Sequence, residues 1–174
     1  MRNLTLYKFD ELSIQAKEVV ITELVQYFDE YPSKIHEVEN SYDIIAQESN
    51  GVYAGTENFL IAYQHGDIFD LLQAVFDVDN VSEIPKEIYF LINYGFIEYI
   101  SLDMLSKNNM VLIKYTTPMR INSATNIELQ NLEVLLNKWL KKVKENTFKQ
   151  LAMSYLNTKG KDNEYFENGK RFVE

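Results

Sequence analysis

A long run of helical periodicity near the C-terminal end constrains the fold of this chain more than any other feature. Between about Leu129 and Leu156, apolar residues recur mostly three or four positions apart, which is the spacing of one buried helix face. The stripe consists of Leu132, Leu136, Trp139, Val143, Leu151 and Tyr155. Another face of the same stretch carries Lys138, Lys141, Lys142, Lys144 and Lys149. The pattern predicts one long amphipathic helix with a lysine-rich face, closed by Gly160.

The N-terminal part of the chain predicts a second amphipathic helix. Leu12 and Ser13 have the character of a helix cap, and Pro32 ends the helix because the residue before a proline avoids the helical conformation. Between these ends, apolar side chains recur every four residues at Ala16, Val20, Leu24 and Phe28. The off-stripe carboxylates are Glu18, Glu23, Asp29 and Glu30. We expect these carboxylates to form a solvated face.

Two shorter helices are predicted in the middle of the chain. Asp67 can cap a helix that carries Ile68, Leu71, Leu72, Val75 and Phe76. After a polar connection over residues 77–83, Pro85 suits the first turn of another helix. This helix carries Ile88, Leu91 and Ile92, and Gly95 is a plausible stop.

Strand patterns are shorter. Asn50-Gly51 predicts a hairpin over residues 42–55, although Ile35, Val38, Tyr42 and Ile45 also have helical spacing with Gly51 as a stop. Residues 110–117 are β-branched and aromatic enough for a strand. Alternation at Ile121, Ser123, Thr125, Ile127 and Leu129 predicts a second strand, close enough for an antiparallel pair. Asn168-Gly169 predicts a terminal hairpin or turn that docks on the body.

These elements predict one α+β domain over residues 1–174, in which amphipathic helices pack a small antiparallel sheet and the long helix comes last. The chain contains no cysteine, which excludes disulfides, thiolate zinc sites and a cysteine nucleophile. A basic start followed by an apolar segment is lacking, as is any apolar run of about 18 residues. We therefore expect a protein of the host-cell cytoplasm that does not enter the membrane.

Charge is distributed unevenly along the sequence. Residues 1–103 contain 5 Lys and Arg against 19 Asp and Glu, a net charge of −14. Residues 104–174 contain 12 against 7, a net charge of +5. An acidic lobe can meet a basic protein surface. Direct nucleic-acid binding is not expected, because the whole chain is acidic and the lysine-rich face has no arginine for bidentate contacts with bases.

The sequence offers few catalytic or metal-binding constellations. His65 with Asp67 and Asp70 could supply a base and its partner, but adjacent residues rarely face each other, and Asp67 is better explained as a cap. His36 with Glu37 and Glu39 is a weaker candidate. The stretch 77–80, Asp-Val-Asp-Asn, lacks the later glycine and glutamate of a calcium loop. Gly-rich phosphate loops and Gly-x-Ser-x-Gly elbows are lacking too, so we expect no catalytic residues, no metal and no cofactor.

Both ends of the chain resemble a widespread family of small phage and prophage proteins, most of them uncharacterised and some labelled antitoxin-like. The family's aromatic-x-Phe-Asp-Glu-Leu-Ser start matches Tyr7, Phe9, Asp10, Glu11, Leu12 and Ser13, followed by Ala16 and Lys17. Its ending matches Glu164, Tyr165, Phe166, Asn168, Gly169, Lys170 and Arg171. The middle departs from the family, whose Gln-Gly-Asp-Gly segment has only the looser counterpart 47–51. The resemblance implies a mobile-element setting more than a chemistry.

Together these observations predict an acidic, non-enzymatic mobile-element protein that binds and inhibits a host nucleic-acid-handling protein, such as a nuclease, in the manner of an anti-CRISPR or other anti-defence protein. The predicted partner-binding residues are Glu18, Glu23, Asp29, Glu30, Asp70, Asp77, Asp79 and Glu83. The alternatives are a metal-dependent hydrolase or nuclease built on His65, Asp67, Asp70 and Asp77, and an oligomeric antitoxin-like component. The third possibility rests on the 12 tyrosines and 10 phenylalanines, because aromatic residues are enriched in interfaces.

Overall fold

The computed structural model describes residues 5–49, 52–53, 60–64, 66–103, 111–115 and 123–173, and it has the predicted α+β fold. Its contacts divide the chain into two compact units. One unit comprises Met1–Ile44 with Glu145–Glu174, and the other comprises Ile45–Lys144. We call them the terminal unit and the sheet unit. The expectation of a single α+β domain over residues 1–174 stays a prediction, which unfolding experiments can test.

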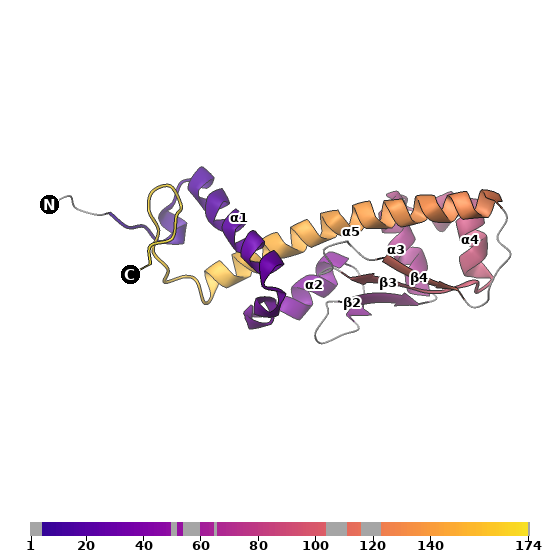
Figure 1. Cartoon of the computed structure of the whole chain (residues 1–174), viewed down its shortest axis with the longest axis horizontal. Coiled ribbons are helices and arrows are strands. Elements are labelled where there is room, and N and C mark those ends of the chain that lie inside the picture. Colours follow the sequence, from indigo (N-terminus) through magenta and orange to yellow (C-terminus); the bar gives the residue numbers. More distant parts are fainter. Residues whose placement is uncertain are drawn as a thin grey trace. The chain divides into compact units, whose positions relative to one another are not determined.

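The terminal unit is mainly helical (Figure 1). It contains the short helix η1 (Phe9–Glu11), helix α1 (Ile14–Glu30), the short helix η2 (Pro32–Glu37) and the last part of α5 (Ser123–Asn157). The predicted N-terminal helix is confirmed, because the Ser13 side chain caps α1 by accepting a hydrogen bond of 3.2 Å from the Ala16 N–H. Ala16, Val20 and Phe28 are buried along its predicted stripe.

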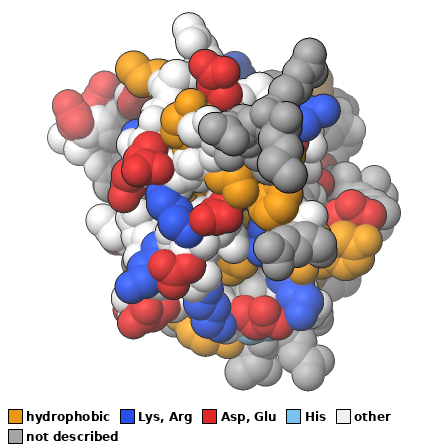
Figure 2. All heavy atoms as spheres, turned by 90° about the vertical axis from the view of Figure 1, so that its left-hand side faces the viewer, with side chains coloured by type: hydrophobic (Ala, Val, Ile, Leu, Met, Phe, Trp, Pro, Cys, Tyr) orange, Lys and Arg blue, Asp and Glu red, His pale blue; other side chains and the backbone are white. Residues whose placement is uncertain are grey.

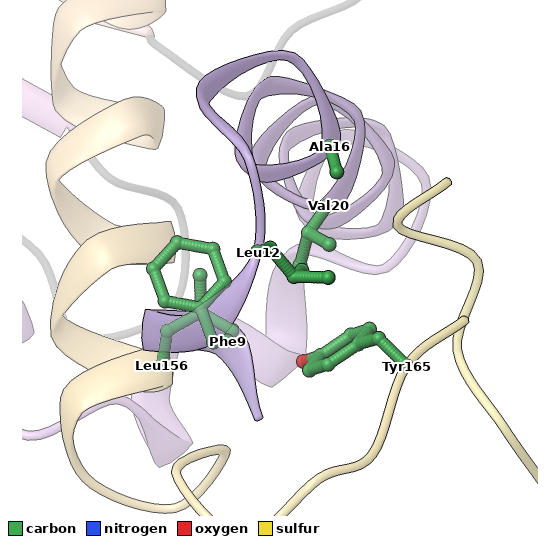
Figure 3. Close-up of a cluster of buried hydrophobic side chains, with 6 residues drawn as sticks. All are labelled: Phe9, Leu12, Ala16, Val20, Leu156 and Tyr165. Carbon is green, nitrogen blue, oxygen red and sulfur yellow. The ribbon is translucent and has the colours of Figure 1, made fainter. Parts of the chain in front are cut away.

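The two ends of the chain join in this unit around one hydrophobic cluster (Figure 3). Its buried members are Phe9, Leu12, Ala16, Val20, Leu156 and Tyr165. Tyr7 and Tyr165 exchange two backbone hydrogen bonds, each 2.9 Å long. A second antiparallel bridge joins Tyr165 to Arg171, and the Gly169 N–H closes the turn between them by donating to the Phe166 carbonyl. The predicted docking of the C-terminal turn is confirmed.

The segment before Asn50 is a helix, so the predicted hairpin over residues 42–55 is wrong there. Helix α2 spans Ser41–Ser49, while Asn50 and Gly51 themselves lie outside the described residues. The alternative helical spacing fits in part: Ile35, Val38 and Ile45 are buried, but Tyr42 is exposed, and Ile35 and Val38 precede α2.

The sheet unit holds an antiparallel sheet of four strands in the order β1-β2-β3-β4. The strands are β1 (Val52–Tyr53), β2 (Leu60–Gln64), β3 (Ile97–Asp103) and β4 (Val111–Tyr115). The predicted strand at 110–117 is confirmed by β4 over its described part. The second strand predicted over residues 121–129 is wrong, because residues 123–129 belong to α5 and 121–122 lie outside the described residues. The partner of β4 is instead β3, where Ile100 lies opposite Ile113.

Both predicted middle helices are present beside the sheet (Figure 1). Helix α3 spans Gly66–Phe76, the short helix η3 spans Val81–Glu83, and α4 spans Lys86–Asn93. Their predicted apolar positions Ile68, Leu71, Leu72, Ile88, Leu91 and Ile92 are buried. One detail differs, because α3 already begins at Gly66. Asp67 therefore lies in the first helical turn, where its charge suits the helix dipole, rather than at the cap.

The long C-terminal helix is confirmed and is longer than predicted, since α5 has 35 residues. Its apolar stripe is buried in both units: at Leu132, Leu136 and Leu140 in the sheet unit, and at Phe148 and Leu151 in the terminal unit. Trp139 and Tyr155 are only partly buried. Among the described residues, there is no helix whose length and apolar character would let it span a membrane.

Candidate interaction surface

The solvent face of α1 carries the first four of the predicted partner-binding residues. Because Ala16, Val20 and Phe28 turn inward, the off-stripe positions Glu18, Glu23, Asp29 and Glu30 are exposed. The helix contains one cation, Lys17, which is partly buried. Its ammonium donates a hydrogen bond of 2.9 Å to the Asp10 carbonyl and lies 5.7 Å from the centre of the Phe9 ring. The outer face of α1 is therefore acidic, as predicted.

Hydrogen bonds and nearby charges shift the pKa values of side chains at the C-terminal end of this face. The hydrogen bond between Tyr31 and the Glu30 carboxylate, together with the charge of that carboxylate, raises the pKa of Tyr31. Just beyond, the Lys34 ammonium donates a hydrogen bond of 2.7 Å to the Glu37 carboxylate, which lowers the pKa of Glu37. Both interactions keep the carboxylate charge at the surface of the terminal unit.

The other four predicted residues belong to a second acidic stretch. We define the acidic segment as residues 67–83, which contain Asp67, Asp70, Asp77, Asp79 and Glu83 but no lysine, arginine or histidine. All five carboxylates are exposed. Within the part of the chain that the structure describes, none of them forms an ion pair. As far as the described residues go, each can therefore meet a cationic group of a partner.

Local hydrogen bonds shape the acidic segment where it leaves α3. Asp77 has a positive φ of 56°, which reverses the chain after the helix, and the Val78 N–H donates to the Gln73 carbonyl over 3.0 Å. The Gln73 side chain donates to the Asp79 carbonyl over 2.8 Å, and the Asn80 side chain caps η3 by accepting from the Ser82 N–H. These contacts restrain the backbone at Asp77, Asp79 and Glu83.

The fold redistributes the charge that is uneven along the sequence. The terminal unit has 9 Lys and Arg against 14 Asp and Glu, a net charge of −5, and the sheet unit has 8 against 12, a net charge of −4. The expected acidic lobe is therefore not a structural unit, because α5 carries its lysines into both. On the face shown in Figure 2, acidic and basic side chains are interspersed rather than collected into one patch.

The eight predicted residues also divide between the units. Glu18, Glu23, Asp29 and Glu30 belong to the terminal unit, and Asp70, Asp77, Asp79 and Glu83 belong to the sheet unit. They form two acidic surfaces of four predicted residues each, and each surface has to be considered as a separate candidate.

The lysine-rich face of α5 is the main basic feature. Lys138, Lys141, Lys142 and Lys149 are exposed, whereas Lys144 is partly buried. Lys149 lies 3.8 Å from Glu145 on the next turn, which reduces the local positive charge.

Catalytic and metal-binding constellations do not assemble in the described part of the chain. His65 lies outside the described residues, and Asp67 and Asp70 are exposed on the surface of α3. Among the described residues, His, Asp and Glu side chains nowhere form a group of three that could hold a metal ion. The ring of His36 meets the hydroxyl of Tyr42 at 2.9 Å, and Glu37 pairs with Lys34 instead of with the histidine.

An exposed aromatic face on α4 was not anticipated from the sequence. Tyr89 and Phe90 lie off the buried stripe, and Tyr94 follows directly after the helix. These three residues are 38%, 50% and 65% exposed. The signal was present in the sequence, since two aromatic residues occupy positions of an amphipathic helix where polar residues are the rule.

Comparison of the chain with protein-family models, curated proteins and solved structures finds no match.

Proposed function

We propose that this chain is a non-enzymatic protein from a mobile element that binds a basic surface of a host nucleic-acid-handling protein and thereby inhibits it. The observation that carries the proposal is the acidic segment, whose five exposed carboxylates are accompanied by no cation and form no ion pair among the described residues. The resemblance of the chain ends to phage and prophage proteins supports the mobile-element setting.

The physical basis is electrostatic complementarity. A groove that normally holds DNA or RNA presents lysines and arginines, and a carboxylate-bearing surface can occupy it in place of phosphates. Complementary charge accelerates encounter and selects partners more than it adds affinity. The effect reaches about 8 Å at physiological ionic strength, so binding should weaken as salt rises.

The acidic segment is the stronger of the two acidic surfaces. On α1, Asp29 already has an interaction within the chain. In the acidic segment, hydrogen bonds restrain the backbone, and the carboxylates form no ion pair with any residue that the structure describes. A surface with a restrained backbone and without internal ion pairs loses the least free energy on binding, because no internal pair has to be broken.

The test is affinity capture from a bacterial host lysate at low and moderate salt, read by mass spectrometry, followed by binding kinetics with the purified partner. The test variant is Asp79→Lys with Glu83→Lys. The matched control is Glu133→Lys with Glu167→Lys, which makes the same change in net charge at exposed positions outside both acidic surfaces.

We expect capture of one stoichiometric nucleic-acid-handling protein. Its association rate constant should be at least about tenfold lower with the test variant than with the natural chain, while the control variant stays within a few fold of the natural chain. Equal binding by all three proteins, or no such partner at either salt concentration, would overturn the proposal.

A further inference from the structure

The aromatic face of α4 is a preassembled surface. The rings of Phe90 and Tyr94 lie 4.4 Å apart between centroids, and Phe90 also stacks on Phe96 at 6.1 Å with an angle of 24° between the ring planes. Half or more of the Phe90 and Tyr94 side chains remains exposed although Ile88, Leu91 and Ile92 anchor the helix in the core. Exposed clusters of large apolar side chains of this kind mark interaction sites.

The aromatic face adjoins the acidic segment, and Tyr89 is the link. Its ring lies 5.5 Å from that of Phe69, the neighbour of Asp70 on α3. Tyr89 also lines an open pocket of about 390 Å³. The other lining residues are Asn80, Val81, Ser82, Ile84 and Lys86. Asp79 and Glu83 bracket the first three of them in the sequence, so Tyr89 brings one edge of the aromatic face beside the acidic segment.

The net charge of this region determines which kind of partner group it can bind. On α4 itself, Lys86 and Glu87 cancel, so the five carboxylates of the acidic segment set the sign. A purely apolar partner would cover these carboxylates without offering them a counter-charge. Nucleic-acid bases could stack on the rings, but their phosphates would be repelled. A cationic group that also stacks on rings meets both requirements, and the guanidinium of arginine is the side chain that does so.

We propose that the α4 aromatic face and the acidic segment together bind an arginine-bearing segment of a protein partner, with guanidinium groups lying on Phe90 and Tyr94 and neighbouring cations meeting Asp70, Asp79 and Glu83. This inference rests on the proposed function and names the chemistry of the partner. It predicts a preference for arginine over lysine, because the lysine ammonium is more strongly hydrated and cannot stack.

The experiment measures fluorescence anisotropy of the full chain with two labelled peptides, one of alternating Gly and Arg and one of alternating Gly and Lys with the same charge. The test variant is Phe90→Leu with Tyr94→Leu, which keeps apolar area but removes the rings. The matched control is Tyr27→Leu with Tyr31→Leu, an exposed pair in the terminal unit whose rings are 5.2 Å apart. Circular dichroism checks that each variant is folded.

We expect the natural chain and the control to bind the arginine peptide more tightly than the lysine peptide, by about two- to fivefold for each ring engaged. The test variant should bind both peptides equally. Equal binding of both peptides by the natural chain, with affinity lost in Asp79→Lys/Glu83→Lys, would overturn the arginine site while leaving the proposed function intact. A preference that disappears in the Tyr27/Tyr31 variant instead would place the site on α1 and overturn this assignment. Binding of neither peptide would overturn the arginine site, while affinity capture from lysate tests the proposed function separately.

Discussion

Gly169 lies against the backbone of Ala16, so closely that a Cβ atom at residue 169 would come within 2.4 Å of the Ala16 carbonyl oxygen. The glycine also has a φ of +85°, a conformation that other residues rarely adopt. Two ends of the chain, more than 150 residues apart in sequence, therefore meet at a contact that admits no side chain.

Gly169→Ala should destabilise the protein by at least about 2 kcal/mol, because it adds an unfavourable φ to a backbone clash. Gly95→Ala is the matched control: its φ is +71°, but a Cβ there would meet no atom within 4 Å. The control should cost only about 1 kcal/mol. Urea unfolding followed by circular dichroism measures both, and equal losses would show that the contact with Ala16 is unimportant.

The same variant tests whether residues 1–174 form one cooperative domain. Gly169 belongs to the terminal unit, whereas the single tryptophan of the chain, Trp139, belongs to the sheet unit. In one cooperative domain, tryptophan fluorescence and circular dichroism report the same lowered midpoint. A fluorescence midpoint that Gly169→Ala leaves unchanged would mean that the sheet unit unfolds by itself.

The end motifs behind the family resemblance have structural roles here. Ser13 caps α1, the Glu11 carboxylate accepts a hydrogen bond of 2.7 Å from the Lys8 N–H, and Tyr165 is buried in the end cluster. Asn168 accepts a hydrogen bond from the Lys170 N–H over 3.1 Å. The sequence pattern at both ends therefore describes how the chain closes on itself.

Helices α1, α3, α4 and α5 were predictable because their apolar side chains recur at the spacing of one buried helix face. Strand β3 was missed because its register shifts between Ile97 and Tyr99, which breaks the alternation that marks a strand. Helix α2 was mistaken for a hairpin because part of its stabilisation is non-local: Tyr63 of β2 donates a hydrogen bond to the Ser49 carbonyl at its end.

The sequence was enough to predict that the candidate carboxylates are exposed, but not which of them lie in the same unit. Off-stripe positions on a helix are solvated whatever the tertiary fold, so Glu18 and Asp70 were correctly expected on the surface. Which carboxylates share a unit depends on chain topology, which divides the predicted set between α1 and the acidic segment.

Tyr63→Phe should cost about 1–2 kcal/mol at neutral pH, because it leaves a buried carbonyl without its donor. The hydroxyl of Tyr63 lies 2.6 Å from the Ser49 carbonyl oxygen, and both residues are buried. Urea unfolding measures the loss. A cost below a few tenths of a kcal/mol would mean that water or a rearranged backbone satisfies this carbonyl.

The cost of Tyr63→Phe should also depend on pH. Burial raises the pKa of Tyr63 and outweighs the opposite effect of its hydrogen bond to Ser49. The folded state therefore keeps the proton that the unfolded chain releases near pH 10. The stability contributed by this group is fully present below about pH 10 and declines above it. The difference in free energy of unfolding between the natural chain and Tyr63→Phe should shrink above pH 10, and a constant difference would contradict this.

Ser13→Ala should destabilise the protein by about 1 kcal/mol, since it removes the side chain that caps α1. Ser13→Asp is the control, because aspartate caps as well as serine and adds a favourable charge at the helix N-terminus. Thermal unfolding of the three proteins should rank Ser13→Asp at or above the natural chain and Ser13→Ala below it. An alanine variant as stable as the aspartate variant would show that the cap contributes nothing.

Asp79→Lys with Glu83→Lys should leave the fold intact and stabilise it slightly, by up to about 0.5 kcal/mol at low salt, although it weakens partner binding. The reason is that the five carboxylates of the acidic segment repel one another and form no ion pair among the described residues. Added salt should remove the gain, because it screens the repulsion in the natural chain. Urea unfolding at low and high salt measures this, with Glu133→Lys/Glu167→Lys as the charge-matched control. A loss of more than about 1 kcal/mol confined to the Asp79/Glu83 variant would mean that these carboxylates support the fold, and their exposure could no longer be explained by partner binding alone.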